Sequence, residues 1–218
     1  MTASVPNYKG TGFVPVIASL KAHPRGAREV PPALQHYLDR QILSTDWYPE
    51  RDFMALTECL ARILERDGMR DVWTYFGKVA AERDLKGTQQ QVPAARRIAK
   101  AGIYRSFAQD EEIGVSPFLA RMTMLWSLYH DSGRMVVGRS PDSDRVALCR
   151  VYEYQFMTPH FTELLTAYWS EYVNMLSVRA ALCFKRAVGG AEPFSEWDLT
   201  VERTPENLLA LAALPVLS

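Results

Sequence analysis

The first 132 residues show the apolar spacing of amphipathic helices. Two long helices are predicted over 50–68 and 69–85, because apolar residues recur there every three or four positions. Gly68 and Gly87 follow these runs, and glycine readily takes the left-handed conformation that ends a helix. The apolar positions are Phe53, Leu56, Leu60, Ile63 and Leu64 in the first helix, and Val72, Trp73, Phe76, Val79 and Ala80 in the second.

The pattern changes after Gly133. The segments 134–139 and 146–156 are rich in β-branched and aromatic residues and predict a hairpin, and 178–188 and 194–201 predict two further strands. Between the two pairs, a long amphipathic helix is predicted to start at Thr158-Pro159. Its apolar face consists of Phe161, Leu164, Leu165, Tyr168, Trp169, Tyr172, Val173 and Leu176.

This order of elements predicts an α+β fold, with a β-β-α-β-β antiparallel sheet packed by the long helix. We expect one domain over 13–202, in which 13–132 is the helical part and 133–202 contains the sheet. Residues 1–12 lack periodicity and are expected to form a flexible arm, and 203–218 a short helix and tail.

Composition narrows the class of protein. Of 218 residues, 25 are Lys or Arg and 25 are Asp or Glu, so bulk positive charge cannot attract nucleic acid. A weak basic helix is predicted over 93–108, but the acids at 110–112 offset its charge. No apolar run reaches the ~20 residues of a membrane span. Three cysteines without a C-x-x-C pair favour neither a disulfide framework nor zinc, so we expect a cytoplasmic protein.

Several short blocks in this order suggest a family. They are Trp47-Tyr48-Pro49, Tyr129 to Arg134, Tyr154 to Phe161, Gly189-Gly190 and Glu196-Trp197. The succession resembles a family of uncharacterised, largely myxobacterial cytosolic proteins. It is also distantly similar to haem/nitric-oxide-binding and 4-vinyl-reductase-like sensor domains, which implies an α+β ligand-sensing fold over roughly 13–202. Where the family often has glycine in its long helix, this chain has Ala167-Tyr168-Trp169.

Catalytic signatures are absent from the sequence. His130-Asp131-Ser132 contains the residue types of a hydrolase triad, but triads are assembled from distant segments, and a polar helix end explains these residues better. No G-x-S-x-G, P-loop, G-x-G-x-x-G or H-E-x-x-H motif occurs, and the four histidines lack metal-ligand spacing. We therefore expect no catalytic residues and no metal site.

Haem is the most specific cofactor hypothesis, although we expect no cofactor. Haem needs an axial His or Cys in an apolar pocket, and His130 and His160 both lie beside aromatic residues. The residues Tyr129, Ser132 and Arg134 are spaced Y-x-x-S-x-R, so they miss the Y-x-S-x-R pattern of haem/nitric-oxide domains by one residue.

Aromatic residues of two predicted helices provide the candidate binding site. The candidates are Trp126, Tyr129, His130, Tyr168, Trp169 and Tyr172. They favour a non-catalytic sensory or regulatory module that binds a small apolar ligand or a protein partner, including a second copy of the chain. The alternatives are a haem-binding gas sensor or small-molecule enzyme with a pocket near Tyr129 and His130, and a structural scaffold subunit.

Overall fold

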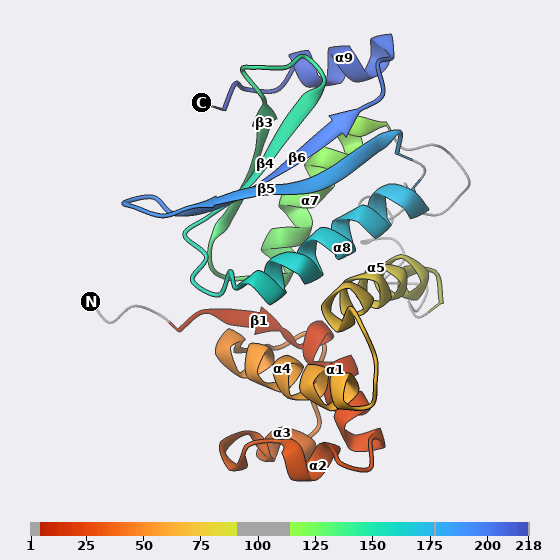
Figure 1. Ribbon diagram of the computed structural model, residues 1–218, viewed down its shortest axis with the longest axis vertical. Coiled ribbons are helices and arrows are strands. Elements are labelled where there is room, and N and C mark those ends of the chain that lie inside the picture. Colours follow the sequence, from red (N-terminus) through yellow and green to blue (C-terminus); the bar gives the residue numbers. More distant parts are fainter. Residues whose placement is uncertain (1–4, 91–113, 177, 218) are drawn as a thin grey trace.

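The computed structural model describes residues 5–90, 114–176 and 178–217. The elements form three tiers along the long axis (Figure 1): a sheet with two helices against it, a single helix α5 across the middle, and a group of N-terminal helices. A continuous apolar core extends from Phe13 in the N-terminal tier to Leu199 in the sheet. The tiers are therefore packed together by side chains as well as joined by the chain.

The N-terminal tier is built around two helices that pack on each other. The longer one, α4, buries Leu56, Leu60 and Ile63 along one face, which the three- and four-residue spacing predicts. A two-stranded ribbon of β1 and β2 lies beside this tier. Together with this ribbon, the N-terminal tier consists of β1 (Asn7–Lys9), α1 (Gly10–Ala22), α2 (Gly26–Glu29), the 3-10 helix η1 (Pro32–Leu34), α3 (His36–Asp39), β2 (Trp47–Pro49) and α4 (Glu50–Arg66).

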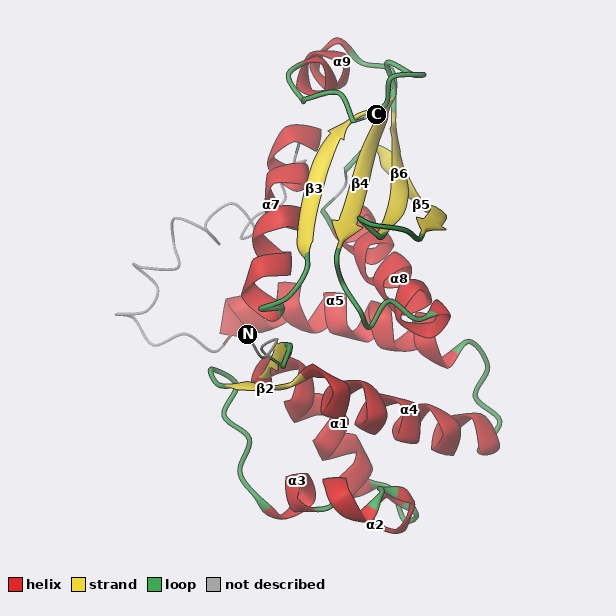
Figure 2. Cartoon of the chain, turned by 90° about the vertical axis from the view of Figure 1, so that its left-hand side faces the viewer, coloured by secondary structure: helices red, strands yellow, loops and turns green. Residues whose placement is uncertain are grey.

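The remaining elements build the middle helix and the sheet tier. The sheet is antiparallel throughout, with strand order β3-β4-β6-β5. Helices α7 and α8 cover one of its faces, and α9 lies at its end (Figure 2). The bounds are α5 (Val72–Gln90), α7 (Val115–Tyr129), β3 (Arg134–Arg139), β4 (Val146–Tyr152), α8 (Pro159–Met175), β5 (Ala180–Val188), β6 (Phe194–Val201) and α9 (Pro205–Ala212).

Helix α8 joins the sheet to the middle tier. It begins where the sequence indicates, because the Thr158 side chain accepts a hydrogen bond from the Phe161 backbone N–H. On the sheet side, the Trp197 indole donates to the Thr166 hydroxyl at 2.8 Å. On the other side, α5 approaches so closely that a Cβ at Gly77 would lie 2.3 Å from the Leu164 carbonyl oxygen. Glycine at position 77 is therefore required for this packing.

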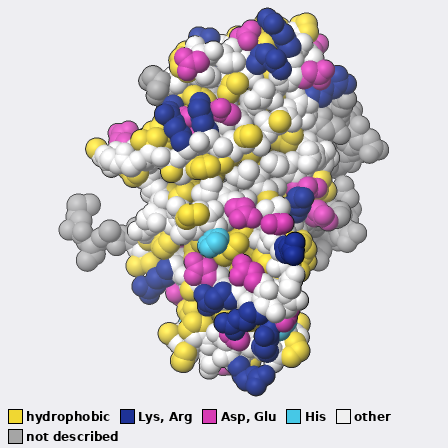
Figure 3. All heavy atoms as spheres, viewed as in Figure 1, with side chains coloured by type: hydrophobic (Ala, Val, Ile, Leu, Met, Phe, Trp, Pro, Cys, Tyr) yellow, Lys and Arg dark blue, Asp and Glu magenta, His cyan; other side chains and the backbone are white. Residues whose placement is uncertain are grey.

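The second face of the sheet is not covered by the N-terminal helices, which lie beyond α5 (Figures 1 and 2). Arg150 and Glu196 are cross-strand partners that form a buried ion pair, and Arg186 reaches the same carboxylate at 3.1 Å. In the view of Figure 3, basic and acidic side chains are interspersed rather than separated by sign.

The predicted α+β class and antiparallel sheet are confirmed. The prediction that 1–12 form a flexible arm is wrong for the described part of this segment. Asn7 to Lys9 form β1, which pairs with β2, and Gly10 already begins α1. The physical reason is pairing with distant segments: the Asn7 backbone N–H donates to Asp131 at 2.5 Å, and the Gly10 N–H donates to the Asp46 carbonyl. The predicted basic helix over 93–108 lies outside the described residues.

Candidate functional site

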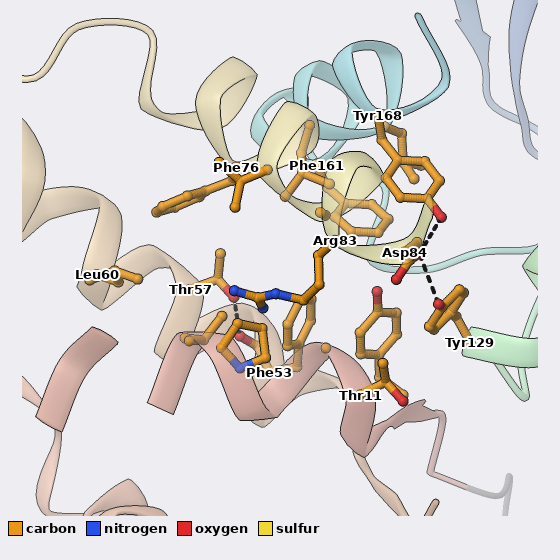
Figure 4. A pocket seen from close by; sticks show the side chains of 18 of the residues that line it. Thr11, Phe53, Thr57, Leu60, Phe76, Arg83, Asp84, Tyr129, Phe161 and Tyr168 are labelled. Carbon is orange, nitrogen blue, oxygen red and sulfur yellow. Dashed lines mark hydrogen bonds between the residues drawn. The ribbon is translucent and has the colours of Figure 1, made fainter. Parts of the chain in front are cut away.

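A cavity of about 340 Å³ lies between the N-terminal tier and the helices α5, α7 and α8. Its walls are mainly apolar and aromatic, and a few polar groups reach into it (Figure 4). This volume falls at the lower end of the range for small-molecule sites. Because residues from β1 to α8 line it, the cavity exists only when all three tiers are assembled.

Five of the six candidate residues from the sequence line this cavity: Trp126, Tyr129, His130, Tyr168 and Trp169. The sixth, Tyr172, is buried beside them, with its ring centre 4.9 Å from that of Tyr168. Their role in binding a ligand stays a prediction. The aromatic face of α8 is buried within the chain, so the expectation that this face forms a homodimer surface is wrong. A dimer through other surfaces remains a prediction.

Asp84 provides the first polar centre of the cavity. Its Oδ2 atom accepts hydrogen bonds from the Tyr129 hydroxyl at 2.8 Å and from the Tyr168 hydroxyl at 2.6 Å. Burial raises the pKa of Asp84, and the two tyrosine hydrogen bonds oppose that rise. Burial likewise raises the pKa of Tyr129 and Tyr168, so both phenols keep their protons. The three side chains form one preorganised unit drawn from α5, α7 and α8.

Glu50 provides a second polar centre, next to the cavity. Its side chain is fully buried at the first residue of α4 and bonds to three groups from the sheet tier. His130 Nδ1 lies 2.6 Å from Oε1, the Tyr154 hydroxyl donates to the same oxygen at 2.5 Å, and the Ser132 hydroxyl donates to Oε2 at 3.2 Å. This carboxylate therefore ties the N-terminal tier to the end of α7 and to the chain after β4.

Arg83 is a cationic side chain that lines the cavity, and Figure 4 shows it extending toward Thr57. The Thr57 hydroxyl donates to the Phe53 carbonyl and so is already engaged. Within the described residues, no carboxylate lies within ion-pair distance of Arg83. Arg83 is exposed, so its charge is solvated and its position is not fixed by a partner.

Sequence reasoning missed three residues of the site: Tyr8, Glu50 and Asp84. Asp84 left a usable signal, because it follows Ala80 by four positions on the apolar face of its helix, where a carboxylate is out of place. Glu50 left none, since an acid at the start of a helix is ordinarily an exposed partner of the helix dipole. Tyr8 reaches the cavity through β1 pairing, which no local pattern predicts.

His130, Asp131 and Ser132 do not form a triad. His130 and Ser132 both bond to Glu50, whereas Asp131 binds the backbone N–H and the side-chain amide of Asn7. Across the described part of the chain, no three His, Cys, Asp or Glu side chains are grouped as a metal site would require. None of the described helices is long and apolar enough to cross a membrane.

Solved structures with a similar fold are H-NOX domains. An oxygen-binding H-NOX domain related to soluble guanylate cyclases matches with a TM-score of 0.51 and 12% identity, covering 88% of this chain and 94% of that one. A structure from a study of heme distortion in the H-NOX family gives 0.53 and 11%, covering 89% and 95%. A Cs H-NOX variant carrying 4-cyano-L-phenylalanine gives 0.53 and 9%, covering 90% and 98%.

These matches define the class of fold: the chain has an H-NOX-like α+β architecture. At such low identity the likeness concerns the fold alone. No family model matches the chain, and no curated protein matches it. The resemblance to a myxobacterial family therefore stays a prediction.

The described residues do not provide the full set of contacts that a haem would need. The most suitable axial ligand, His130, is only 6% exposed, and its ring stacks on Trp126 at 4.0 Å with Tyr8 edge-on at 4.7 Å. An iron would bind in the plane of the imidazole rather than above its face, and in that plane Nδ1 is already held by Glu50 at 2.6 Å, so Nε2 is the nitrogen that could serve as a ligand. His160, the other candidate, stacks on Trp73 at 4.9 Å and is not among the residues lining the cavity.

Tyr129, Ser132 and Arg134, whose spacing is close to the clamp pattern of haem/nitric-oxide domains, do not form a charged clamp in the structure. Tyr129 bonds to Asp84 and Ser132 to Glu50, so both hydroxyls are engaged inside the protein. Arg134 is exposed on β3, where its guanidinium lies 4.3 Å from the Tyr152 ring. The three residues thus point to three different partners, and the one-residue mismatch in their spacing is consistent with this arrangement.

Proposed function

We propose that this chain is a sensory or regulatory domain that binds a small, largely apolar ligand in the cavity between the N-terminal tier and α5, α7 and α8. The observation that carries the proposal is the aromatic cavity of about 340 Å³ with only a few polar groups. The H-NOX-like fold supports a sensory role, because the similar structures include an oxygen-binding domain.

The position of the cavity supports regulation rather than chemistry. Its walls come from the N-terminal tier and from the helices on the sheet, so a bound ligand would contact both. A ligand that prefers one arrangement of these tiers shifts the population toward it. The few described groups of catalytic type are committed to structural hydrogen bonds, as the Glu50 and Asp84 centres illustrate.

A thermal-shift screen of the purified chain against small apolar metabolites tests the proposal. A ligand that binds only the folded state raises the melting temperature in a concentration-dependent way. The variant Ala80→Phe places a ring in the cavity and should abolish the shift, whereas Ala18→Phe, on the exposed side of α1, should retain it. A screen without any stabilising compound would contradict the proposal and favour a structural scaffold.

Haem binding is the alternative, and the fold of the similar structures is what favours it. Spectroscopy distinguishes the hypothesis of an apolar ligand from that of haem. We expect no Soret band that depends on His130 when hemin is added to the purified chain. A Soret band present in the wild type and lost in His130→Ala would overturn that expectation and would establish the alternative.

A further inference from the structure

Among the described residues, hydrogen bonds reach only one of the two carboxyl oxygens of Asp84. Both tyrosine hydroxyls donate to Oδ2, from Tyr129 and from Tyr168. In the described part of the chain no group donates a hydrogen bond to Oδ1, and Figure 4 shows this oxygen turned into the cavity. The arrangement fixes the orientation of the carboxyl and presents one acceptor atom to a ligand.

The surroundings of this oxygen are aromatic. Tyr8, Trp126, Tyr129 and Tyr168 all line the same cavity, and the rings of Tyr8 and Tyr129 are 6.1 Å apart. Aromatic faces attract cations, and a desolvated site strengthens that attraction. A carboxylate enclosed by such rings is the usual chemistry for recognising an organic ammonium group.

We propose that the cavity binds an organic cation, namely a primary ammonium group on an apolar body, with the ammonium donating to Asp84 Oδ1. This inference rests on the proposed ligand-binding function and names the ligand class. Asp84 is the better anchor than Arg83, because two hydrogen bonds hold its short side chain, whereas Arg83 is long and exposed. An anionic ligand paired with Arg83 is the competing outcome.

The pH dependence of ligand affinity provides an independent test of this proposal. Burial raises the pKa of Asp84, so this carboxyl keeps its proton to a higher pH than an exposed aspartic acid does. An ammonium ligand favours the ionised carboxylate, and its affinity should therefore increase as the pH rises through that pKa. The charged and titratable groups that face Asp84 are Arg83 on its own helix, Tyr8 on β1, Tyr129 on α7 and Tyr168 on α8, and burial keeps these three phenols neutral.

Calorimetry with three ligands that share a phenylethyl body tests the proposal on the full chain: phenethylamine, 2-phenylethanol and 3-phenylpropionate. The amine should bind about tenfold more tightly than the alcohol, as a charge-assisted hydrogen bond implies. Asp84→Asn keeps an oxygen for both tyrosines and should weaken the amine about tenfold while leaving the alcohol unchanged. Asp39→Asn, an exposed matched change on α3, should alter neither.

The outcomes separate this inference from the proposed function. If the alcohol or the propionate binds and the amine does not, the cation proposal is overturned while the cavity remains a ligand site. A preference for the propionate that Arg83→Gln abolishes would assign the site to anions. If none of the three binds, the cation proposal fails, and the wider thermal-shift screen decides whether the proposed function fails with it. Should Asp84→Asn not fold, the pH dependence of amine affinity in the wild type gives the answer, since a flat profile contradicts the proposal.

Discussion

Removing the Glu50 carboxylate tests whether this group holds the N-terminal tier to the sheet tier. The side chain is 0% exposed and bonds to His130, Tyr154 and Ser132 at 2.6, 2.5 and 3.2 Å. Glu50→Ala leaves two buried groups, on His130 and Tyr154, and the part-buried Ser132 hydroxyl without their partner. At about 1–2 kcal/mol for each orphaned group, the loss is about 3–6 kcal/mol. Since whole domains are stable by about 5–15 kcal/mol, this change should remove a large part of the total.

Urea unfolding followed by far-UV circular dichroism measures the effect. Glu50→Gln retains one acceptor oxygen, so its loss should be smaller than that of Glu50→Ala. Glu65→Ala is the control on the same helix, because Glu65 is exposed and its removal should change stability by less than about 0.5 kcal/mol. A loss below about 1 kcal/mol in Glu50→Ala would refute the reasoning, because the three contacts could then not be structural.

Three further predictions concern packing, capping and charge. Gly77→Ala should destabilise the chain by about 1–3 kcal/mol despite the better helix propensity of alanine, because its Cβ would meet the Leu164 carbonyl; an unchanged urea midpoint would contradict this. Thr158→Ala should cost about 1 kcal/mol through the lost bond to Phe161, and Thr158→Ser should restore most of it in the same assay. Because the pKa of Asp84 is raised in the folded chain, the folded state holds the proton of this carboxyl to a higher pH than the unfolded state does. The protonated carboxyl therefore stabilises the fold fully below about pH 4, and this stabilisation is lost as the pH rises through the folded pKa. The stability of Asp84→Asn relative to the wild type should therefore increase with pH over that range, and urea midpoints that run parallel at every pH would show that Asp84 is not perturbed.

Local patterns were sufficient for most elements of the fold. Helix α8 follows directly from the Thr158-Pro159 start and its apolar spacing, and β6 spans the predicted 194–201. Each of these signals lies within a few residues of the element that it predicts. The ribbon of β1 and β2 has no such signal, because each strand has three residues and is defined by its partner about forty positions away.

The site was predictable only where aromatic residues revealed it. Trp126, Tyr129 and Tyr168 stand out on two helices, and the structure places all three at the cavity. The acidic residues of the site could not be predicted, because their roles depend on tertiary contacts. Asp84 belongs to the site through hydrogen bonds from tyrosines that lie 45 and 84 positions away in the sequence. A sequence read locally cannot tell such a carboxylate from a solvated one.

The contact between β1 and Asp131 limits how early during synthesis the cavity can exist. The Asn7 backbone N–H bonds to Asp131, which follows 124 positions later, and the adjacent Tyr8 supplies part of the cavity wall. At about 5–20 residues per second, a ribosome needs about 6–25 s to make the intervening chain. During synthesis β1 can therefore pair with β2 well before its bond to Asp131 forms, and no ligand can meet a finished cavity before the second half of the chain has emerged.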